Sequence, residues 1–446
     1  MLAITAGATV LTGIGLSSIS VLFPELRRAF PDASNATLSW VANVFTIVGA
    51  ATLIPAGAIA DRTGKKRMVL LGVALFVGGS VLGAVAWSPG VLIAARIIQS
   101  LGASCYTPAS AALLMSAYPP ERLASAIGVW SVCGGISSAF GPPLAGLLVQ
   151  LSGWRATMWF NVPVGIAIFA LGSIYITETD RDESRSIPDL LGTLLVSAAI
   201  SPIVYALVQS KSWGWFDERT IGWLGAGLVV ALVFVWRCAR HHNPLLDLSL
   251  LRISMVRVAN LGTFVMAIAW FCVYFALTQY ITTYWEWSAM KAGIVTAPVS
   301  LGAAALGFTV GRLAPRYGHK RFILAGAASF IALALIGRVL ITETPSVWRV
   351  VVLCAAMGCA SGSAFPSFIA LSVFDVEPSD RAVVSGINFM SQRIGTTVGT
   401  SFAIAFVTAK VGGGIAGFRQ SLAVTAAGAA CALVIGLRVR NTSQPV

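Results

Sequence analysis

Long apolar runs separated by short polar breaks extend along almost the whole chain. A helix that crosses the hydrocarbon core of a bilayer needs roughly 20 apolar residues. Fourteen runs meet this requirement, so the pattern predicts an all-α integral membrane protein with fourteen transmembrane helices. The predicted helices lie at about residues 2–23, 38–60, 68–87, 91–115, 122–150, 157–178, 188–208, 220–237, 258–284, 289–313, 320–341, 347–374, 381–409 and 418–437.

Composition and charge support this class and indicate an orientation. Hydrophobic residues make up 57% of the chain and charged residues 11%, against about 25% charged residues in soluble domains. The net charge is +13. If both termini are cytoplasmic, the inner breaks and the tail carry about twice as many Lys and Arg residues as the outer breaks, which follows the positive-inside rule. We therefore expect a multi-pass protein of the cell (inner) membrane whose partner is the lipid bilayer and not nucleic acid.

The sequence carries no pattern of a soluble catalytic or cofactor-binding site. Its seven cysteines are odd in number and scattered, which predicts neither a disulfide framework nor a zinc site. Gly64-Lys65 resembles the end of a phosphate-binding loop, but the earlier glycine of that motif is Ile59 here, so ATP is not expected. The first apolar run begins at Leu2 without a basic segment before it, which is not typical of a cleavable signal. We expect no enzyme, no cofactor and no metal.

An internal repeat divides the chain into two halves. Residues 57–67 (GAIADRTGKKR) align without gaps on residues 311–321 (GRLAPRYGHKR), and a looser echo joins residues 119–128 to 378–386. We predict two six-helix bundles, residues 1–178 and residues 258–446 with a short tail, joined by residues 179–257, which contain two additional linking helices. Parallel repeats of this kind place a substrate path between the halves near the bilayer midplane.

The charged residues that lie away from the ends of the apolar runs are arginines. The 17 Asp and Glu residues lie in polar breaks or at the ends of runs, whereas Arg96, Arg338 and Arg393 lie within runs. An arginine at membrane depth costs at least about 2.5–3.5 kcal/mol unless it faces polar groups, so Arg96 and Arg393 must point inward. Arg338 is near the outer end of its run, where it can reach the interface. One interpretation of Arg96 is structural, with Gln99 and free carbonyls satisfying its five donors.

These motifs resemble the major facilitator superfamily, specifically its 14-helix drug:proton antiporter branch (EmrB/QacA-like). The resemblance covers essentially the whole chain. It rests on the loop at residues 57–67, residues 96–102 (RIIQSLG), residues 135–146 with Gly141-Pro142-Pro143, residues 153–155 (GWR) with 161–163 (NVP), and residues 393–395 (RIG). It implies efflux of small amphipathic compounds by alternating access, coupled to protons. It also implies a second interpretation of Arg96, Gln99 and Arg393, in proton or substrate handling.

The same resemblance assigns a conformational gate to the loop after the second helix. In the proteins that it resembles, the loop's Asp holds the two halves together on the cytoplasmic side by meeting the N-terminal end of a helix in the other half. Here Asp61 would meet the thirteenth helix, near Ser379, with Arg122 as a second partner. The other members are Gly57, Arg62, Gly64, Lys65, Lys66 and Arg67. The basic residues could instead serve only as positive-inside anchors. The second copy has Pro315 in place of Asp61, so the gate should be one-sided.

A glycine-proline pattern in the fifth predicted helix is typical, by resemblance, of exporters. Gly135, Gly141, Pro142 and Gly146 would pack against the opposite half, at the tenth helix, and limit leakage. The alternative is that these residues only allow tight helix packing.

The chain departs in the first helix from the branch that it resembles. The branch carries an acidic residue nine positions before the proline that ends this helix, and counting back from Pro24 reaches Gly15. A buried carboxylate is suited to proton coupling because desolvation raises its pKa toward neutrality, which hydroxyl groups such as that of Ser17 cannot replace. Glu25, just outside the first helix, and Glu286, between the ninth and tenth, are either substitutes for this acid on the extracellular side or solvated loop charges, and we favour the second interpretation. The histidines lie in predicted cytoplasmic loops: His241, His242 and His319.

Aromatic and polar residues in the predicted helices suggest a substrate cavity. Trp270 and Tyr274, followed by Gln279, lie in the ninth helix, which by resemblance lines the cavity. An aromatic-rich pocket suits planar or amphipathic compounds, although aromatic core packing is the other explanation. The remaining candidates are Ser17, Tyr106, Thr107, Trp130, Asn388 and Gln392.

Two transport functions follow from this sequence, together with one that is not transport. Proton-coupled efflux of small amphipathic molecules agrees with the branch. An uncoupled or differently coupled carrier for anionic or lipid-like substrates agrees with the missing acid of the first helix. A transporter-like sensor or scaffold is the third alternative.

Overall fold

The computed structural model describes residues 1–446 with the exception of residues 18, 34, 119–125, 127–128, 131–132, 135–136, 138–140, 142–143, 179–188, 215, 242–243, 288, 378–379, 408–413 and 441–446. Every regular element within the described residues is helical. Nine of the helical segments found there are long and apolar enough to cross a membrane, and each overlaps one of the predicted runs. The count of fourteen spans stays a prediction.

The helices fall into three consecutive groups. The first contains α1 (Leu2–Ser17), α2 (Ile19–Ala29), α3 (Asn35–Thr63), α4 (Lys65–Ala84), α5 (Pro89–Ala117) and α7 (Arg155–Tyr175). The second contains α8 (Leu190–Trp213), α9 (Glu218–Arg240) and the short 3-10 helix η1 (Leu250–Arg252). The third contains α10 (Ser254–Thr283), α11 (Ala289–Thr296), α12 (Pro298–Tyr317), α13 (His319–Leu340), α14 (Val347–Ser372), α15 (Arg381–Val407) and α16 (Ile415–Leu437).

Most predicted helix bounds differ from those in the structure by a few residues, and two predicted helices differ further. The first run, predicted to end at residue 23, extends to Ala29 as α1 and α2. The run at 289–313 is divided into α11 and α12, and Pro298 occupies the start of α12. Proline is favoured at a helix start because its missing N–H has no helical partner there. An apolar count alone does not detect such a break.

The internal repeat is visible in the backbone. Gly64 separates α3 from α4 with φ 108°, and Gly318 separates α12 from α13 with φ 80°. Non-glycine residues avoid these angles, so the turn that joins the second and third helices of each half requires glycine. The two aligned segments of the sequence therefore adopt the same local structure.

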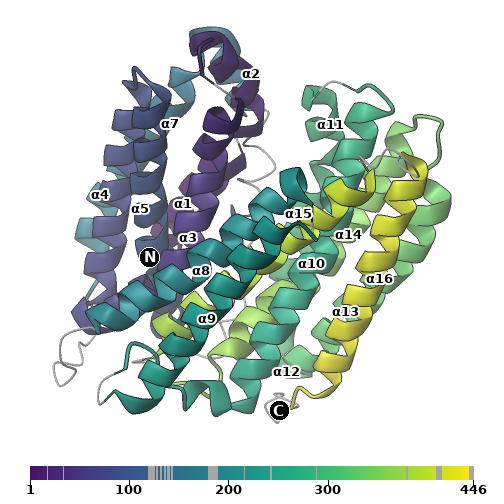
Figure 1. The fold of residues 1–446 in the computed structure, drawn as a ribbon. Helices are drawn as coiled ribbons and strands as arrows, with labels where there is room; N and C mark the ends of the chain where they lie inside the picture. Colours follow the sequence, from purple (N-terminus) through teal and green to yellow (C-terminus); the bar gives the residue numbers. More distant parts are fainter. Residues whose placement is uncertain are drawn as a thin grey trace.

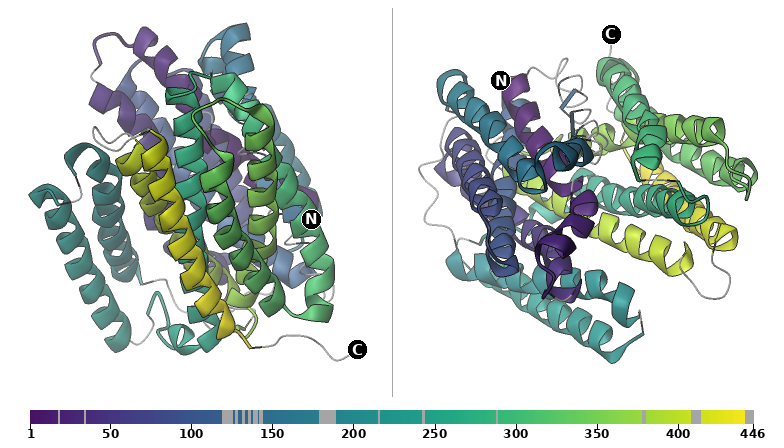
Figure 2. Two further views of the ribbon diagram at one scale, coloured as in Figure 1. Left: turned by 90° about the vertical axis from the view of Figure 1, so that its right-hand side faces the viewer. Right: turned by 90° about the horizontal axis from the view of Figure 1, so that it is seen from above.

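Helices of the first and third groups stand on opposite sides of the molecule, with the linking helices along one side (Figures 1 and 2). In the first group α4 packs against α5 and α7, and in the third group α10 packs against α14, α15 and α16. Two helices connect the groups: α15 also packs against α3 and α5, and α8 packs against both α3 and α15. We call the contact of α15 with α3 and α5 the seam.

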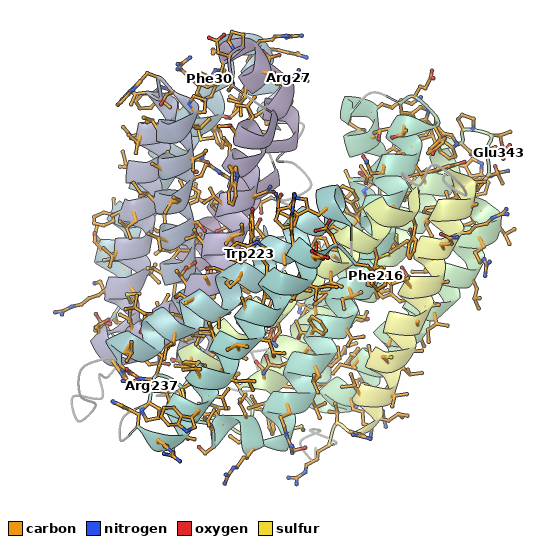
Figure 3. The ribbon with its side chains drawn as sticks, in the orientation of Figure 1. Arg27, Phe30, Phe216, Trp223, Arg237 and Glu343 are labelled. Carbon is orange, nitrogen blue, oxygen red and sulfur yellow. The ribbon has the colours of Figure 1, made fainter. Side chains whose placement is uncertain are left out.

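The linking pair is held to the first group and to itself by specific contacts. The rings of Trp40 in α3 and Tyr205 in α8 stack with centroids 5.4 Å apart, and the Ser197 hydroxyl donates to the Ala51 carbonyl at 3.2 Å. Before α8, the Asp189 carboxylate accepts hydrogen bonds of 2.7 and 3.0 Å from Arg237, which lies at the lower end of α9 in Figure 3. Burial disfavours the charged form of Asp189, but these bonds and one from the Gly192 amide hold its pKa below the usual value.

We predict that Gly72→Val destabilises the protein whereas Gly78→Val, on the same helix, does not. A Cβ atom at Gly72 would lie 2.6 Å from the Gly102 carbonyl oxygen of α5, and one at Gly78 would have nothing within 4 Å. Overpacking of this kind costs about 1–3 kcal/mol. Thermal unfolding of the detergent-purified variants should show a lower Tm for Gly72→Val alone; equal Tm values for the two variants would contradict the observed α4–α5 packing.

Candidate functional site at the seam

Asp61 joins the first and third groups at one end of the seam. Its Oδ2 atom accepts a 2.9 Å hydrogen bond from the amide of Val383, which is 322 residues away in the chain, and its Oδ1 atom lies 3.8 Å from Nζ of Lys65. The Asp61 side chain is only 1% exposed. Val383 is in the first turn of α15, where backbone amides have no helical acceptor and the helix dipole favours negative charge. We call Asp61, Lys65 and the first turn of α15 the clasp.

The structure thus places Asp61 against the helix that sequence analysis expected, although α15 begins at Arg381. Arg122, the expected second partner, lies outside the described residues. Arg381 makes the additional contact: its guanidinium donates to the Met115 carbonyl of α5 at 3.4 Å. Sequence reasoning missed this residue, although the echo between residues 119–128 and 378–386 aligns Arg381 with Arg122.

The other gate residues tie the same loop to its surroundings. Arg62 donates to the Pro244 carbonyl at 3.4 Å, and Lys66 donates through Nζ to the Ser173 carbonyl of α7 at 2.8 Å. A Cβ atom at Gly64 would collide with the Glu178 carboxylate, which accepts from the Lys66 amide at 3.1 Å. Gly57 is buried in α3, and Arg67 is exposed. Arg62 and Lys66 therefore hold the loop to neighbouring elements, whereas the exposed Arg67 can serve as a positive-inside anchor at the membrane surface.

Beyond the clasp the seam is tightly packed. A Cβ atom at Gly386 would lie 2.8 Å from the Leu53 carbonyl oxygen of α3, and the Trp130 and Phe389 rings are 5.6 Å apart. One buried apolar cluster there combines side chains of α3 and α15 with the segment that leads into α10: Ile54, Ala58, Leu245, Leu246, Leu250, Val383, Val384 and Ile387. The two halves are therefore closed against each other at this end.

Arg96 is sealed inside the first group of helices. The side chain is 0% exposed. Its Nε atom donates to the Val41 carbonyl at 3.2 Å, Nη1 donates to Gln99 at 2.9 Å, and the guanidinium lies 4.4 Å from the centre of the Phe45 ring. Gln99 in turn donates to the Ser80 hydroxyl at 2.8 Å. These are the kinds of partner that the structural interpretation of Arg96 expected, and they do not place Arg96 beside a wet passage.

Arg393 has a different environment at the seam. Its side chain keeps partial exposure, and its charge acts on the hydroxyl group of Tyr106 in α5. Tyr106 is fully buried, and its hydroxyl lies 2.6 Å from that of Thr12 in α1. Arg393 thus faces groups from the opposite half. The two arginines, which the sequence treats alike, are distinct in the fold.

Comparison with known proteins identifies the family of the chain. A model of the Major Facilitator Superfamily matches residues 5–255 and 259–446.

The chain belongs to the Major Facilitator Superfamily.

It is similar to several bacterial members of this superfamily. The multidrug resistance protein Stp of Mycobacterium tuberculosis (strain ATCC 25618 / H37Rv) is 31% identical over 87% of this chain and 73% of its own length. The tetracenomycin C resistance and export protein of Streptomyces glaucescens is 27% identical over 92% and 76%. The methylenomycin A resistance protein of Bacillus subtilis (strain 168) is 28% identical over 90% and 86%. The protein is therefore a multi-pass membrane transporter of small molecules.

A solved structure shares the fold. The human organic anion transporter MFSD10 (TETRAN) superposes with a TM-score of 0.72, covers 98% of both chains and has 14% sequence identity. At that identity the likeness concerns the fold alone.

Within this superfamily fold, the expected cavity residues separate into packed and partly exposed groups. Asn388 is buried between α10 and α15 and donates to Asn260 at 3.2 Å and Thr263 at 3.0 Å. Trp270 and Tyr274 stack at 5.0 Å, and Trp130 is buried against Phe389. Five candidates keep partial exposure: Thr107, Trp270, Tyr274, Gln279 and Gln392. Packing explains Asn388 and Trp130, so they are not open to a ligand in this conformation.

The glycine-proline pattern is only partly described. Gly141 is buried and Gly146 is half-buried. Gly135, Pro142 and the side chain of Ser17 lie outside the described residues. The expected contact of this motif with the tenth helix stays a prediction.

Gly15, where the branch carries an acidic residue, lies close to Arg96 in the structure. A Cβ atom at Gly15 would lie 3.2 Å from the Phe76 ring and 4.0 Å from Nη1 of Arg96. A carboxylate at this position would therefore meet Arg96, whose Nη2 atom has no hydrogen-bond partner among the described residues. Among those residues the buried carboxylates are Asp61 and Asp189, and both lie near helix ends.

We predict that Asp61→Asn weakens the clasp and slows transport. Asparagine can still accept from Val383 but loses the charge that favours a helix N-terminus, a contribution of about 0.3–2 kcal/mol. Maleimide labelling of a single cysteine at Val384, in a background without the native cysteines, should increase by about 2- to 30-fold as the seam opens. Asp32→Asn, at an exposed site, is the control. Unchanged labelling and turnover would exclude a gating role.

We predict that Arg96→Gln lowers stability, whereas Arg338→Gln, at an exposed arginine, does not. The substitution leaves the Val41 carbonyl and Gln99 without their donor, at a cost of about 1–3 kcal/mol. Thermal unfolding in detergent measures the difference. A normal Tm combined with lost transport would instead assign Arg96 to proton or substrate handling.

Proposed function

We propose that this protein is a secondary active transporter that exports small amphipathic compounds by alternating access. The observation that carries the proposal is the clasp, because a charged contact between the two halves at one end of the seam is suited to hold one conformation closed. The names of similar proteins, which refer to multidrug resistance and to antibiotic resistance and export, support export over uptake.

The proposal includes the architecture expected from the sequence. Residues 1–178 and 258–446 form the two moving bundles, residues 179–257 link them, and fourteen helices span the membrane in the manner of the EmrB/QacA-like branch. The basic residues of the gate loop favour a cytoplasmic location for the clasp, in a cell (inner) membrane with both termini cytoplasmic. The described conformation is then closed toward the cytoplasm.

Alternation between a closed and an open seam needs a contact that stabilises the closed state measurably but can still be broken in each cycle. Asp61 loses its hydrogen bond to Val383 when the seam opens, and the Lys65 ammonium and water can then solvate the carboxylate. A net contribution of about 0.3–2 kcal/mol is comparable to the few kcal/mol that separate the states of a two-state protein. The clasp can therefore bias the cycle without arresting it.

Two forms of energy coupling are proposed. Proton-coupled antiport is what the branch implies. The second candidate is an uncoupled or differently coupled carrier, and Gly15 favours it, because this position, whose Cβ atom would lie 4.0 Å from Nη1 of Arg96, lacks the carboxylate that would bind a proton. Neither candidate uses ATP.

Reconstituted protein should discriminate between the two forms. We expect purified protein in liposomes to move ethidium, a permanent cation, faster under an imposed pH gradient if export is proton-coupled, and nigericin should abolish the acceleration. A rate that ignores the gradient would favour the second candidate. Absence of flux for ethidium and for anionic and neutral fluorescent compounds, relative to protein-free liposomes, would reject transport altogether and favour a sensor or scaffold.

A further inference from the structure

The guanidinium group of Arg393 lacks partners of the kind that Arg96 and Arg237 have in the described structure. Arg96 has two hydrogen-bond acceptors and an aromatic ring, and Arg237 has a carboxylate. Among the described residues, none accepts a hydrogen bond or forms an ion pair with the Arg393 side chain. A cation at membrane depth without such partners is costly, and charges of this kind mark substrate or ion pathways.

The position of Arg393 on α15 directs it toward the first group of helices. Gly386 packs against the Leu53 carbonyl of α3, and seven residues make nearly two turns of helix. Arg393 therefore lies on the same face of α15 as Gly386, about 10 Å farther from the clasp. The electrostatic interaction with Tyr106 agrees with this direction. The guanidinium thus sits at the seam beyond its tightly packed end, where its side chain keeps partial exposure.

The groups around Arg393 suit an anion and not a cation. The nearby hydroxyl groups of Tyr106 and Thr12 lie 2.6 Å apart and hydrogen-bond to each other, and both residues are buried. Within the described part of the chain no carboxylate is buried near the middle of α15 or α5. Gln392, the neighbour of Arg393, is also partly exposed.

We propose that Arg393 binds the acidic group of the transported compound, so that this protein exports amphipathic organic anions. The inference rests on the transport function proposed above and specifies its substrate class. The sulfonate, carboxylate or phosphate of the substrate supplies the negative charge that the guanidinium lacks, and its five donors match such oxygens. The apolar part of the substrate then lies along the seam.

An anionic substrate changes the energetics of export. A membrane potential of 100 mV, negative inside, favours outward movement of one negative charge by a factor of about 50. A carrier that neutralises the substrate with Arg393 and returns empty can therefore export it without a proton-binding carboxylate. The absence of an acid at Gly15 is consistent with such a cycle.

Matched pyrene probes with permanent charges test this inference. Pyrenebutanesulfonate and pyrenebutyl-trimethylammonium share one apolar body and differ in the sign of the charge. In detergent, we expect wild-type protein to bind the sulfonate more tightly than the ammonium compound. Arg393→Gln should weaken sulfonate binding by about 10- to 100-fold, Arg393→Lys should retain part of it because the charge remains without the planar donors, and the control Arg338→Gln should not alter it.

Transport in phosphatidylcholine liposomes gives the second readout. A potassium diffusion potential set with valinomycin should accelerate sulfonate flux in the direction of the positive side, and Arg393→Gln should remove this response. Adding phosphatidylglycerol to the liposomes separates the two sources of an acidic group, since a bound lipid headgroup would compete with the sulfonate and lower its flux. Sulfonate flux that persists in phosphatidylcholine alone supports a soluble anion as the substrate.

The outcomes are distinguishable. Flux of the ammonium probe without flux of the sulfonate would overturn the anion assignment and leave the proposed export function intact. Wild-type sulfonate affinity in Arg393→Gln, with a normal Tm and elution volume, would also overturn it. Absence of flux for both probes, with ethidium still transported, would overturn this inference alone, whereas absence of flux for both probes, ethidium and neutral compounds would reject the proposed function as well.

Discussion

The cost of removing a charge from water is the constraint on which the rest of this structure depends. Asp61 meets the first turn of α15 and Lys65, Arg96 meets Gln99 and the Val41 carbonyl, and Asp189 meets Arg237. Some of these contacts join helices that are far apart in the chain, and others connect neighbouring residues of the same segment. A buried charge needs a partner, and that partner can lie in any element that packs beside it. The charges therefore specify how apolar helices, which pack against each other with little selectivity, are arranged.

The linking helices take part in this arrangement. Helix α8 packs against both α3 and α15, and Arg62 of the gate loop reaches the Pro244 carbonyl in the segment after α9. Leu245, Leu246 and Leu250 from that segment share one buried cluster with residues of α3 and α15. A change at the seam must therefore displace side chains of the linker as well as those of the two bundles. The linker is mechanically connected to the clasp and is not only a tether.

Much of the fold follows from the sequence because the relevant signals are local. Apolar run length predicts helices, and the repeated segment predicts the paired turns in which Gly64 and Gly318 adopt positive φ. The approach of Asp61 to the start of α15 follows from the resemblance together with the chemistry of a helix N-terminus. The division at Pro298 was missed because an apolar count ignores it, although the proline itself was visible.

The different environments of Arg96 and Arg393 could not be predicted from composition or spacing. Both lie within apolar runs, but the acceptors of Arg96 include a carbonyl of another helix, 55 residues away, and only the packing of α3 against α5 brings that carbonyl close. Arg393 lies at the seam between halves, where a permanently packed partner would have to separate in every transport cycle. A mobile ligand can satisfy the guanidinium without joining the halves. Arg96 is surrounded by one bundle and is suited to a structural role. Arg393 lies between two bundles and is therefore suited to binding a ligand.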